Sequence, residues 1–497
     1  MDKKTEGVSV RRESDVPSIL SKILHDKKMI KRILFTLGIV IVYKLLTFMP
    51  IPGIDIEALR ASFNNSDNIA RINIFNAGEL RRVSICALGL MPYFSSCILI
   101  MILGAVIPFF KRCYAMGGQK GREKIVKSTY YLTIALSLVQ GYFISQWLES
   151  ANFGGLSMVI SPGWGFRIIT VFSLTAGVFL LLWLARLIND HGIGNGVAIL
   201  VLFGIVPKFL IIIGQFVQRD LAGGQLFFLL VTFIASIAVT WLMSTSTQKV
   251  PIIYNNSNIK NSITLRFSWT GKAPIGFAQV VIFFPVTIAA FCPWLNKFAT
   301  LISHGGWLYT ILYSISILFF AYFLIAVLFR PREISDKMKK HGCQIENVAL
   351  GRETAEYLNS KMNRNTIVTA LFLIAVGILP SIYSKTVCSV SYLTITFISY
   401  ATLVVIVGIF YDLKCQIESY FAMKESDKGE WGVAYVALDE IEAEIKKGFL
   451  ETKDIPCVIE PLRFTWGMPI RTAVDQYRLY VPSKKQEEAV KILVQNS

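Results

Sequence analysis

Charged residues are scarce in this chain of 497 residues, since Asp, Glu, Lys and Arg make up 17% of it against 54% for hydrophobic residues. The mean hydropathy of +0.53 is higher than that of a soluble domain with a polar surface. Within the apolar runs charges are nearly absent: Lys44 lies toward one end of a run, and Arg186, Asp190 and Asp412 lie at run ends. Pumps and secondary transporters commonly keep charged groups inside their spans, although inserting each one into the membrane costs about 2.5–3.5 kcal/mol on insertion scales. The composition predicts a membrane protein and argues against a proton relay or an ion cage.

Motifs for catalysis and for cofactor or metal binding are also missing from the sequence. It has no phosphate-binding loop of the form GxxxxGK followed by Ser or Thr, no GxSxG and no HExxH. The eight cysteines are scattered without a CxxC pair, and the four histidines have no spacing typical of metal ligands. We therefore expect no enzyme activity, no catalytic residues, no cofactor, no metal ion and no disulfide framework.

Apolar runs of about 20 residues, enough to cross a hydrocarbon core of about 30 Å, recur along the chain. They predict ten membrane-spanning helices, at 31–49, 84–107, 128–148, 166–188, 196–216, 225–244, 273–293, 307–329, 366–384 and 390–411. Ten spans divide into two halves of five, 31–216 and 225–411, and an odd number per half inverts the second half in the membrane. Inverted halves commonly enclose a path between them. We expect an all-α polytopic membrane protein of two inverted five-helix halves around a central pore.

The distribution of Lys and Arg predicts the orientation in the membrane. Residues 330–365 carry eight and residues 111–127 carry six, whereas 149–165 carry none. By the positive-inside rule both termini are cytoplasmic. Residues 1–30 are basic without an apolar core, so we expect a cytoplasmic tail and not a secretory signal. Much of the net charge of +17 therefore serves to set the orientation in the membrane. A basic cytoplasmic face also suits anionic lipid, RNA or an acidic protein partner. We expect no specific nucleic-acid partner.

Three segments outside the spans have structure of their own. Residues 245–272 alternate apolar and polar side chains around Asn255-Asn256, which predicts a β-hairpin. Residues 330–365 begin with a basic helix and continue with a helix that runs into the next span. Residues 424–497 predict a small cytoplasmic α+β domain. Its strands are expected at 431–438, 457–462 and 477–481, with helices at 439–452 and 483–495, the latter capped by Ser483.

Several stretches are more specific than composition. They are MPIPGID (49–55), NIFNAGELRRVSICALGLMPYFSS (73–96), NDHGIGNGVAILVLFGIV (189–206), FRPREISDKMKKHG (329–342) and GRETAEYL (351–358). At these separations and in this span order they closely resemble the SecY/Sec61α family, the channel subunit of the protein translocon, over about residues 20–420. The resemblance implies a protein-conducting channel subunit that passes unfolded preproteins across the membrane and releases apolar segments laterally into lipid.

The resemblance also assigns roles to residues. A plug at about 69–78 includes Ile69, Ile72, Ile74, Phe75 and Gly78. An apolar pore ring is formed by Leu90, Phe94, Val197, Val201, Ala273, Gly276 and Val405. A lateral gate includes Ser95, Ser96, Ser268 and Thr270. Cytoplasmic docking residues are Arg330, Arg332, Lys339, Lys340 and Arg352. Such a ring would seal against ions by dewetting and yield to a passing chain.

The sequence also departs from the family. Ala273 and Gly276 stand where branched aliphatic residues are usual, and Ser268 replaces an Asn. Ala349 replaces a loop arginine, and 245–272 lacks an arginine cluster, which puts normal motor or ribosome coupling in doubt. The implied partners are SecE-like and SecG-like subunits, the motor ATPase SecA or the ribosome, preproteins and membrane lipids, at the cell inner membrane. Two alternatives stay open: a specialised paralogous insertase or export channel, and a ten-span solute transporter, which would need a polar site at the membrane midplane.

Overall fold

The computed structural model describes most of the chain. The described residues are 25–55, 84–110, 119–150, 152–153, 156–217, 231, 234–235, 237–238, 240–242, 245–254, 257–266, 274–275, 277–278, 281, 307–386, 400–425, 431–437, 440–462 and 476–495.

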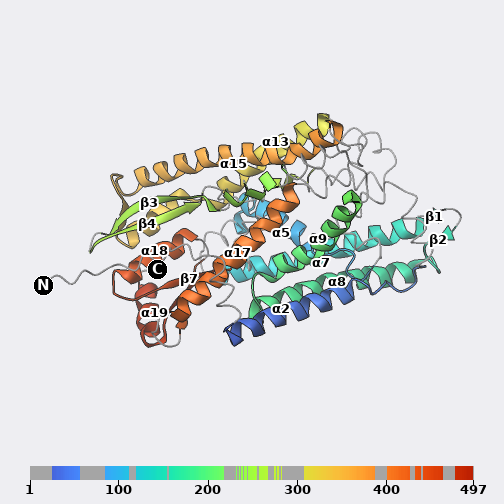
Figure 1. Ribbon diagram of the computed structural model, residues 1–497, viewed down its shortest axis with the longest axis horizontal. Coiled ribbons are helices and arrows are strands. Elements are labelled where there is room, and N and C mark those ends of the chain that lie inside the picture. The colour runs from blue at the N-terminus through green and yellow to red at the C-terminus, as the bar shows by residue number, and fades with distance from the viewer. Residues whose placement is uncertain are drawn as a thin grey trace.

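Long helices make up most of the described structure. They are α2 (Lys27–Leu46), α5 (Met91–Val106), α7 (Gln119–Ser150), α8 (Trp164–His191), α9 (Gly196–Val217), α13 (Trp307–Leu328), α15 (Arg352–Thr386) and α17 (Tyr400–Glu425). Helices α2, α7, α8, α13 and α15 run close to the longest axis of the molecule, while α9 and α17 cross it obliquely (Figure 1). Eight of the ten predicted spans overlap these long helices. The other two, 225–244 and 273–293, lie largely outside the described residues, so the count of ten stays a prediction.

The helices are arranged in two groups with contacts between them. In Figure 1, α13 and α15 pack together along one side of the molecule, and α2, α7 and α8 lie along the other. Between the two sides, α17 contacts both α15 and α9, while α5 packs on α7 and α9 packs on α8. The largest apolar core joins residues of α2, α5, α8 and α9 with Phe320 and Leu324 of α13 and Ile409 of α17.

The outward faces of these helices are apolar. Leu34, Ile41 and Leu45 of α2 are more than 60% exposed, as is Phe172 of α8. A water-soluble surface rarely exposes so many large aliphatic and aromatic side chains together. By length and mean hydropathy two helical runs of the described residues qualify as spans, Trp164–His191 (2.3) and Leu308–Lys340 (2.5), and Met91–Gly104 and Gly196–Val206 are shorter apolar helices. Helices with exposed apolar faces are suited to lipid.

A three-stranded antiparallel sheet lies at one end of the molecule, where Figure 1 shows β3 and β4 beside α18. Strand β3 (Thr247–Tyr254) pairs with β4 (Ser257–Arg266), Thr247 opposite Arg266, which confirms the predicted hairpin. Strand β5 (Cys343–Ile345) adds to the other edge of β3 and was not predicted. Helix α14 (Pro331–Lys340) buries Ile334 and Met338 toward this sheet and has Lys337, Lys339 and Lys340 in its last turn. Cations there complement the helix dipole.

The C-terminal residues form the predicted α+β unit. Strand β6 (Trp431–Ala437), helix α18 (Glu440–Glu451), and strands β7 (Val458–Leu462) and β8 (Gln476–Pro482) are followed by η3 (Ser483–Lys485) and α19 (Gln486–Gln495). The antiparallel sheet has the order β6-β8-β7. The element order is as predicted, but the cap is wrong: Ser483 is the first residue of η3, whose N-cap is Pro482 without a side-chain hydrogen bond. Leu450, Leu479 and Leu493 are fully buried in the core of this unit.

Candidate functional site

The segment before α5 is a turn and not the start of a helix. The span predicted from residue 84 is helical only from Met91, and residues 85–90 form turns. Two residues explain the late start. Gly89 has φ +55°, a conformation that favours glycine, and Pro92 lies in the first turn of the helix, where its missing N–H has no partner to lose. The backbone N–H of Phe94 donates to the carbonyl of Leu90 at 3.1 Å, so these two residues lie one turn apart on one helix face.

The turn between α8 and α9 is held by asparagine side chains. Oδ1 of Asn195 accepts from the backbone N–H of Val197 at 3.1 Å and of Ala198 at 3.4 Å, and Oδ1 of Asn189 accepts from the N–H of Gly196 at 2.7 Å. These bonds satisfy N–H groups that the first turn of a helix leaves without partners. These caps were not predicted, although an Asn directly before an apolar helix is their usual signal.

The same turn joins helices from both ends of the chain. The N–H of Ile193 donates to Oγ1 of Thr36 in α2 at 2.9 Å, and the N–H of Gly194 donates to Oε1 of Gln416 in α17 at 2.7 Å. The hydroxyl of Tyr420 in α17 donates to Oδ2 of Asp26, directly before α2, at 3.0 Å. The turn before α9 is therefore fixed against α2 and α17 by hydrogen bonds from its backbone N–H groups to side chains of those two helices.

Three predicted ring residues meet in one apolar cluster. Leu90, Phe94 and Val197 are buried in the large core, and Val201 is half-buried and packs against it. The same cluster contains residues of the C-terminal half of the chain, including Phe320. Of the remaining predicted ring residues, Val405 lies on α17, but its side chain is not among those that the structure describes. Ala273 and Gly276 lie outside the described residues. The structure thus places the predicted ring residues of α5 and α9 in one apolar cluster with residues of α13 and α17.

The predicted gate residues are only partly described. Oγ of the buried Ser96 donates to the carbonyl of Pro92 at 2.7 Å, within α5 itself. A hydroxyl satisfied in this way needs no partner on a neighbouring helix. Ser95 is half-buried, and Ser268 and Thr270 lie outside the described residues.

The plug prediction falls outside the described residues, but both ends of its segment are placed. Residues 56–83 are not described; Pro50 forms an isolated β-bridge with Ser84, and Ile54 forms another with Val159. The N–H of Asp55 donates to the carbonyl of Met158 at 2.9 Å. The segment that contains the predicted plug therefore leaves and re-enters the helical body at fixed, neighbouring points.

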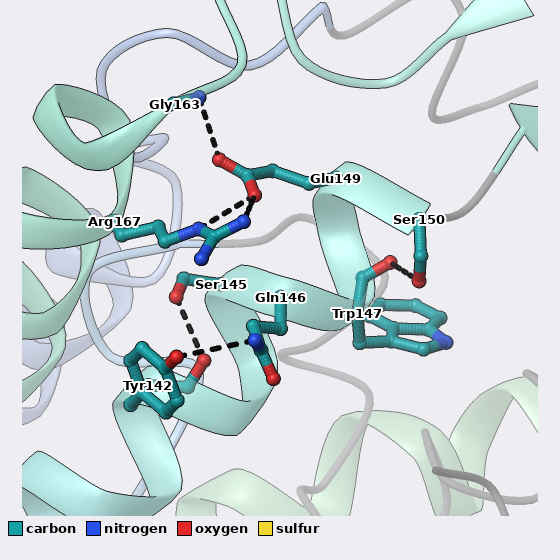
Figure 2. A network of polar contacts seen from close by, with 8 residues as sticks. All are labelled: Tyr142, Ser145, Gln146, Trp147, Glu149, Ser150, Gly163 and Arg167. Carbon is teal, nitrogen blue, oxygen red and sulfur yellow. Dashed lines mark hydrogen bonds and ion pairs between the residues drawn. The ribbon is translucent and has the colours of Figure 1, made fainter.

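The loop between α7 and α8 supports this anchor through an ion pair. The loop carries the short strands β1 (Asn152–Phe153) and β2 (Leu156–Ser157). As Figure 2 shows, the carboxylate of Glu149 at the end of α7 accepts from the backbone N–H of Gly163 at 2.8 Å and from the guanidinium of Arg167 at 2.6 and 2.7 Å. Arg167 also lies over the ring of Trp164 at 5.3 Å. The side-chain hydrogen bond from Arg167 lowers the pKa of Glu149.

This pair predicts a pH dependence. A lowered folded-state pKa makes the contribution of Glu149 to stability present at neutral pH and lost as the pH falls through that pKa. We expect Glu149→Gln to lower the midpoint of thermal unfolding at pH 7, and the midpoints of wild type and variant to converge in acid. The exposed Glu123 on the same helix gives the control Glu123→Gln, with no such difference. A Glu149→Gln difference that is unchanged by acid would contradict this role.

The predicted docking residues lie around α14 and the start of α15. Arg332, Lys339, Lys340 and Arg352 are exposed. Arg330 is half-buried and pairs with Glu333, while Arg352 pairs with Glu356 at 2.7 Å. Within the described part of the chain, no group of three His, Cys, Asp or Glu side chains is placed to hold a metal ion.

Comparison with known proteins gives the family. The SecY family model matches residues 84–414. The chain is 32% identical over 425 residues to the protein translocase subunit SecY of Aquifex aeolicus, covering 82% of this chain and 97% of the relative. It is 33% identical over 371 residues to SecY of Escherichia coli K12, covering 70% and 83%.

Solved structures agree in fold. A structure described as showing that the plug domain of SecY stabilises the closed translocation channel matches with a TM-score of 0.52 at 15% identity, over 81% of this chain and 96% of that one. A second, described as a protein-conducting channel, matches with a TM-score of 0.51 at 13% identity over the same shares. The fold is thus that of the SecY/Sec61 channels, mostly helical with small sheets, and a membrane location follows from the family match. The chain belongs to the SecY family.

Proposed function

We propose that this chain is the channel subunit of a protein translocase, which passes unfolded preproteins across the membrane and releases apolar segments sideways into lipid. One observation supports the proposal beyond family membership: the predicted ring residues Leu90, Phe94 and Val197 lie in one apolar cluster that also contains residues of α13 and α17. An apolar constriction blocks ions by dewetting and yields to an unfolded chain. No covalent chemistry is needed at such a site, so we propose that the chain is not an enzyme.

The proposed layout follows the sequence prediction. Residues 1–30 are a cytoplasmic tail, 31–423 are the ten-helix channel in two inverted halves, and 424–497 are the cytoplasmic domain. The plug at about 69–78 would close the non-cytoplasmic side, because its segment is anchored at the end of the molecule opposite the C-terminal unit (Figure 1). Ser95, Ser96, Ser268 and Thr270 would form the seam through which apolar segments leave. The Ser96 hydroxyl, bonded within its own helix, leaves such a seam free to part.

Partners and location are proposed on the same basis. SecE-like and SecG-like subunits would cover part of the exposed apolar faces of the helices. SecA or a ribosome would dock on the cytoplasmic face near Arg332, Lys339 and Lys340, which are exposed. The membrane would be the cell inner membrane, with both termini in the cytoplasm. A specialised paralogous insertase or export channel is the second candidate, favoured by the C-terminal unit that packs on the β3–β4 hairpin.

A transport assay tests the function. The purified chain is reconstituted into vesicles with a SecE-like subunit and a motor ATPase. A radiolabelled preprotein and small solutes are then added from outside. We expect preprotein to become resistant to external protease, with no saturable solute uptake. Saturable solute uptake without protected preprotein would favour the transporter alternative. Protection of a few clients only would favour the specialised channel.

A further inference from the structure

The C-terminal unit shares an apolar core with the channel. Ile441, Ile445 and Phe449 lie at intervals of four residues and form one face of α18. This face packs into a cluster with the hairpin, α14, β5, the end of α13 and the start of α15. Ile441 and Ile445 are each 1% exposed, and so are Val250 and Ile252 of β3. The unit's own core uses a different set of α18 residues, among them Ala443 and Leu450. Helix α18 therefore belongs to two cores at once.

Polar contacts fix the same face. Both carboxylate oxygens of Glu444 accept hydrogen bonds from Thr264 of β4, from its backbone N–H at 2.6 Å and from its hydroxyl. The hydroxyl of Tyr254 on β3 donates to the carbonyl of Ile445 at 3.2 Å. Nζ of Lys337 on α14 lies 3.0 Å from Oε2 of Glu442. These bonds set the orientation of α18 on the hairpin, which apolar packing alone would not.

The charge states of the groups buried beside the Lys337–Glu442 ion pair are compatible with that pair. Burial raises the pKa of Glu442, but Lys337, the hydroxyl of Tyr435 and Lys446 oppose this, and the net pKa is lowered. Burial, aided by Lys446, lowers the pKa of His341 to about 4, so the imidazole is neutral at pH 7. A neutral imidazole can pack against Phe449, whose ring centroid is 5.1 Å away, without repelling the lysines.

A second attachment reaches the last long helix. Strand β7 packs along α17, and Oγ of Ser419 donates to the carbonyl of Ile459 at 3.1 Å. Figure 1 shows the unit between the hairpin and α17, with α18 on the hairpin side and β7 on the α17 side. The unit thus links the hairpin, which ends at Arg266, to α17, which begins more than 130 residues later at Tyr400.

We propose that the C-terminal unit, formed by β6, α18, β7, β8, η3 and α19, is a permanent brace that fastens the β3–β4 hairpin and α14 to α17, so that these elements move as one body. The observation that favours a brace over a detachable module is the apolar interface. Release would expose Ile441, Ile445 and Phe449 together with their partners on the hairpin, and permanent interfaces are the apolar ones. The fastening does not depend on transport; only the consequence, that the hairpin and α17 move together when the channel opens, rests on the proposed function.

Hydrogen exchange on the full-length protein in lipid nanodiscs tests the fastening. Ile445→Asp introduces a carboxylate at the shared core, and we expect exchange in β3 and β4 to rise at least about tenfold while β8 stays protected. Val436→Asp makes the same kind of change at an exposed position of β6 and should leave the hairpin as in wild type. Unchanged hairpin exchange in Ile445→Asp would overturn the brace and indicate a module that detaches readily.

Ile445→Asp could unfold the C-terminal unit itself, so a second variant changes only residues of the β3–β4 hairpin that contact the unit. Thr264→Val combined with Tyr254→Phe removes hydroxyl contacts to α18 without altering the unit. We expect exchange in α18 to rise severalfold, with α7 and α8 unaffected. If α18 exchange stays at the wild-type value, the two parts are not energetically coupled and the brace is wrong.

The permanence of the brace has its own readout. Spin labels at the exposed Lys249 on β3 and Lys453 after α18 report the distance between hairpin and unit. We expect the same distance distribution in the resting protein and in the protein with a stalled preprotein. A longer second population with preprotein would overturn permanence. Since the resting-state measurements involve no transport, failure of the transport assay with a protected hairpin would count against the proposed function and not against the brace.

Discussion

Gly196→Ala is expected to have the largest effect on stability of any conservative change near the candidate site. A Cβ at Gly196 would lie 1.9 Å from the carbonyl oxygen of Ala185 and 2.6 Å from its carbonyl carbon. Both atoms belong to the backbone of α8, so no side-chain rotation relieves the clash. Helix α9 must move away from α8, and the caps of Asn189 and Asn195 are lost with the movement. We expect the free energy of unfolding to fall by about 3 kcal/mol.

The measurement is thermal unfolding of the purified protein, together with transport by whatever protein folds. Gly38→Ala on α2 is the matched control, because a Cβ there meets no atom within 4 Å. It should leave stability unchanged or raise it by up to about 1 kcal/mol, as Gly→Ala does in an unobstructed helix. Equal unfolding midpoints for the two variants would show that α8 and α9 are not packed as closely as described.

Phe94→Ala is expected to make the closed channel leak ions. The ring of Phe94 is 3% exposed and lies in the cluster with Leu90 and Val197. Removing a buried Phe costs about 3–5 kcal/mol and leaves a cavity. If Phe94 fills the volume that Gly276 leaves open in the predicted ring, the cavity opens at the ring. Lowering the barrier to ion passage by about 1.4 kcal/mol raises the rate of passage tenfold. We therefore expect closed-state conductance to rise at least about tenfold.

Single-channel and bulk conductance in planar bilayers, without substrate, measure the leak. Phe172→Ala on α8 is the control, since Phe172 is 65% exposed and is not a member of the apolar cluster that contains Leu90 and Phe94. Its conductance should match that of wild type. A Phe94→Ala channel that is folded and no leakier than the control would remove Phe94 from the seal.

Local signals made much of the fold predictable. The apolar runs of eight long helices, the alternation around Asn255-Asn256 and the strand and helix order after residue 430 each depend on neighbouring residues alone. The start of α5 was also available, because Pro92 after Gly89 marks a first helical turn. The cap at Ser483 was wrong because Pro482 directly precedes it and η3 begins at the serine itself.

Long-range features were not predictable in the same way. Strand β5 has only three residues, and it is extended because β3 offers it an unpaired edge. The docking of α18 depends on a surface formed by segments 75 to 200 residues earlier. One signal was present: Ile441, Ile445 and Phe449 form an apolar stripe distinct from the face that the unit's own core uses. For the site, the residues that the family motifs indicate on α5 and α9, Leu90, Phe94 and Val197, lie in one cluster. Their role as a pore ring stays a prediction, as do the plug and the gate residues.

Site-specific crosslinking to a stalled preprotein tests the central claim, that this cluster lines the path of a polypeptide. Photoreactive residues are placed at Leu90, Phe94 and Val201, and at Phe172 and Phe319, which are 65% and 59% exposed on outward faces. The complex contains the channel, a SecE-like subunit and a preprotein halted part-way. We predict crosslinks to the preprotein at positions 90, 94 and 201, and none at 172 or 319. Absence of crosslinks at all three positions in an intact complex would contradict the account.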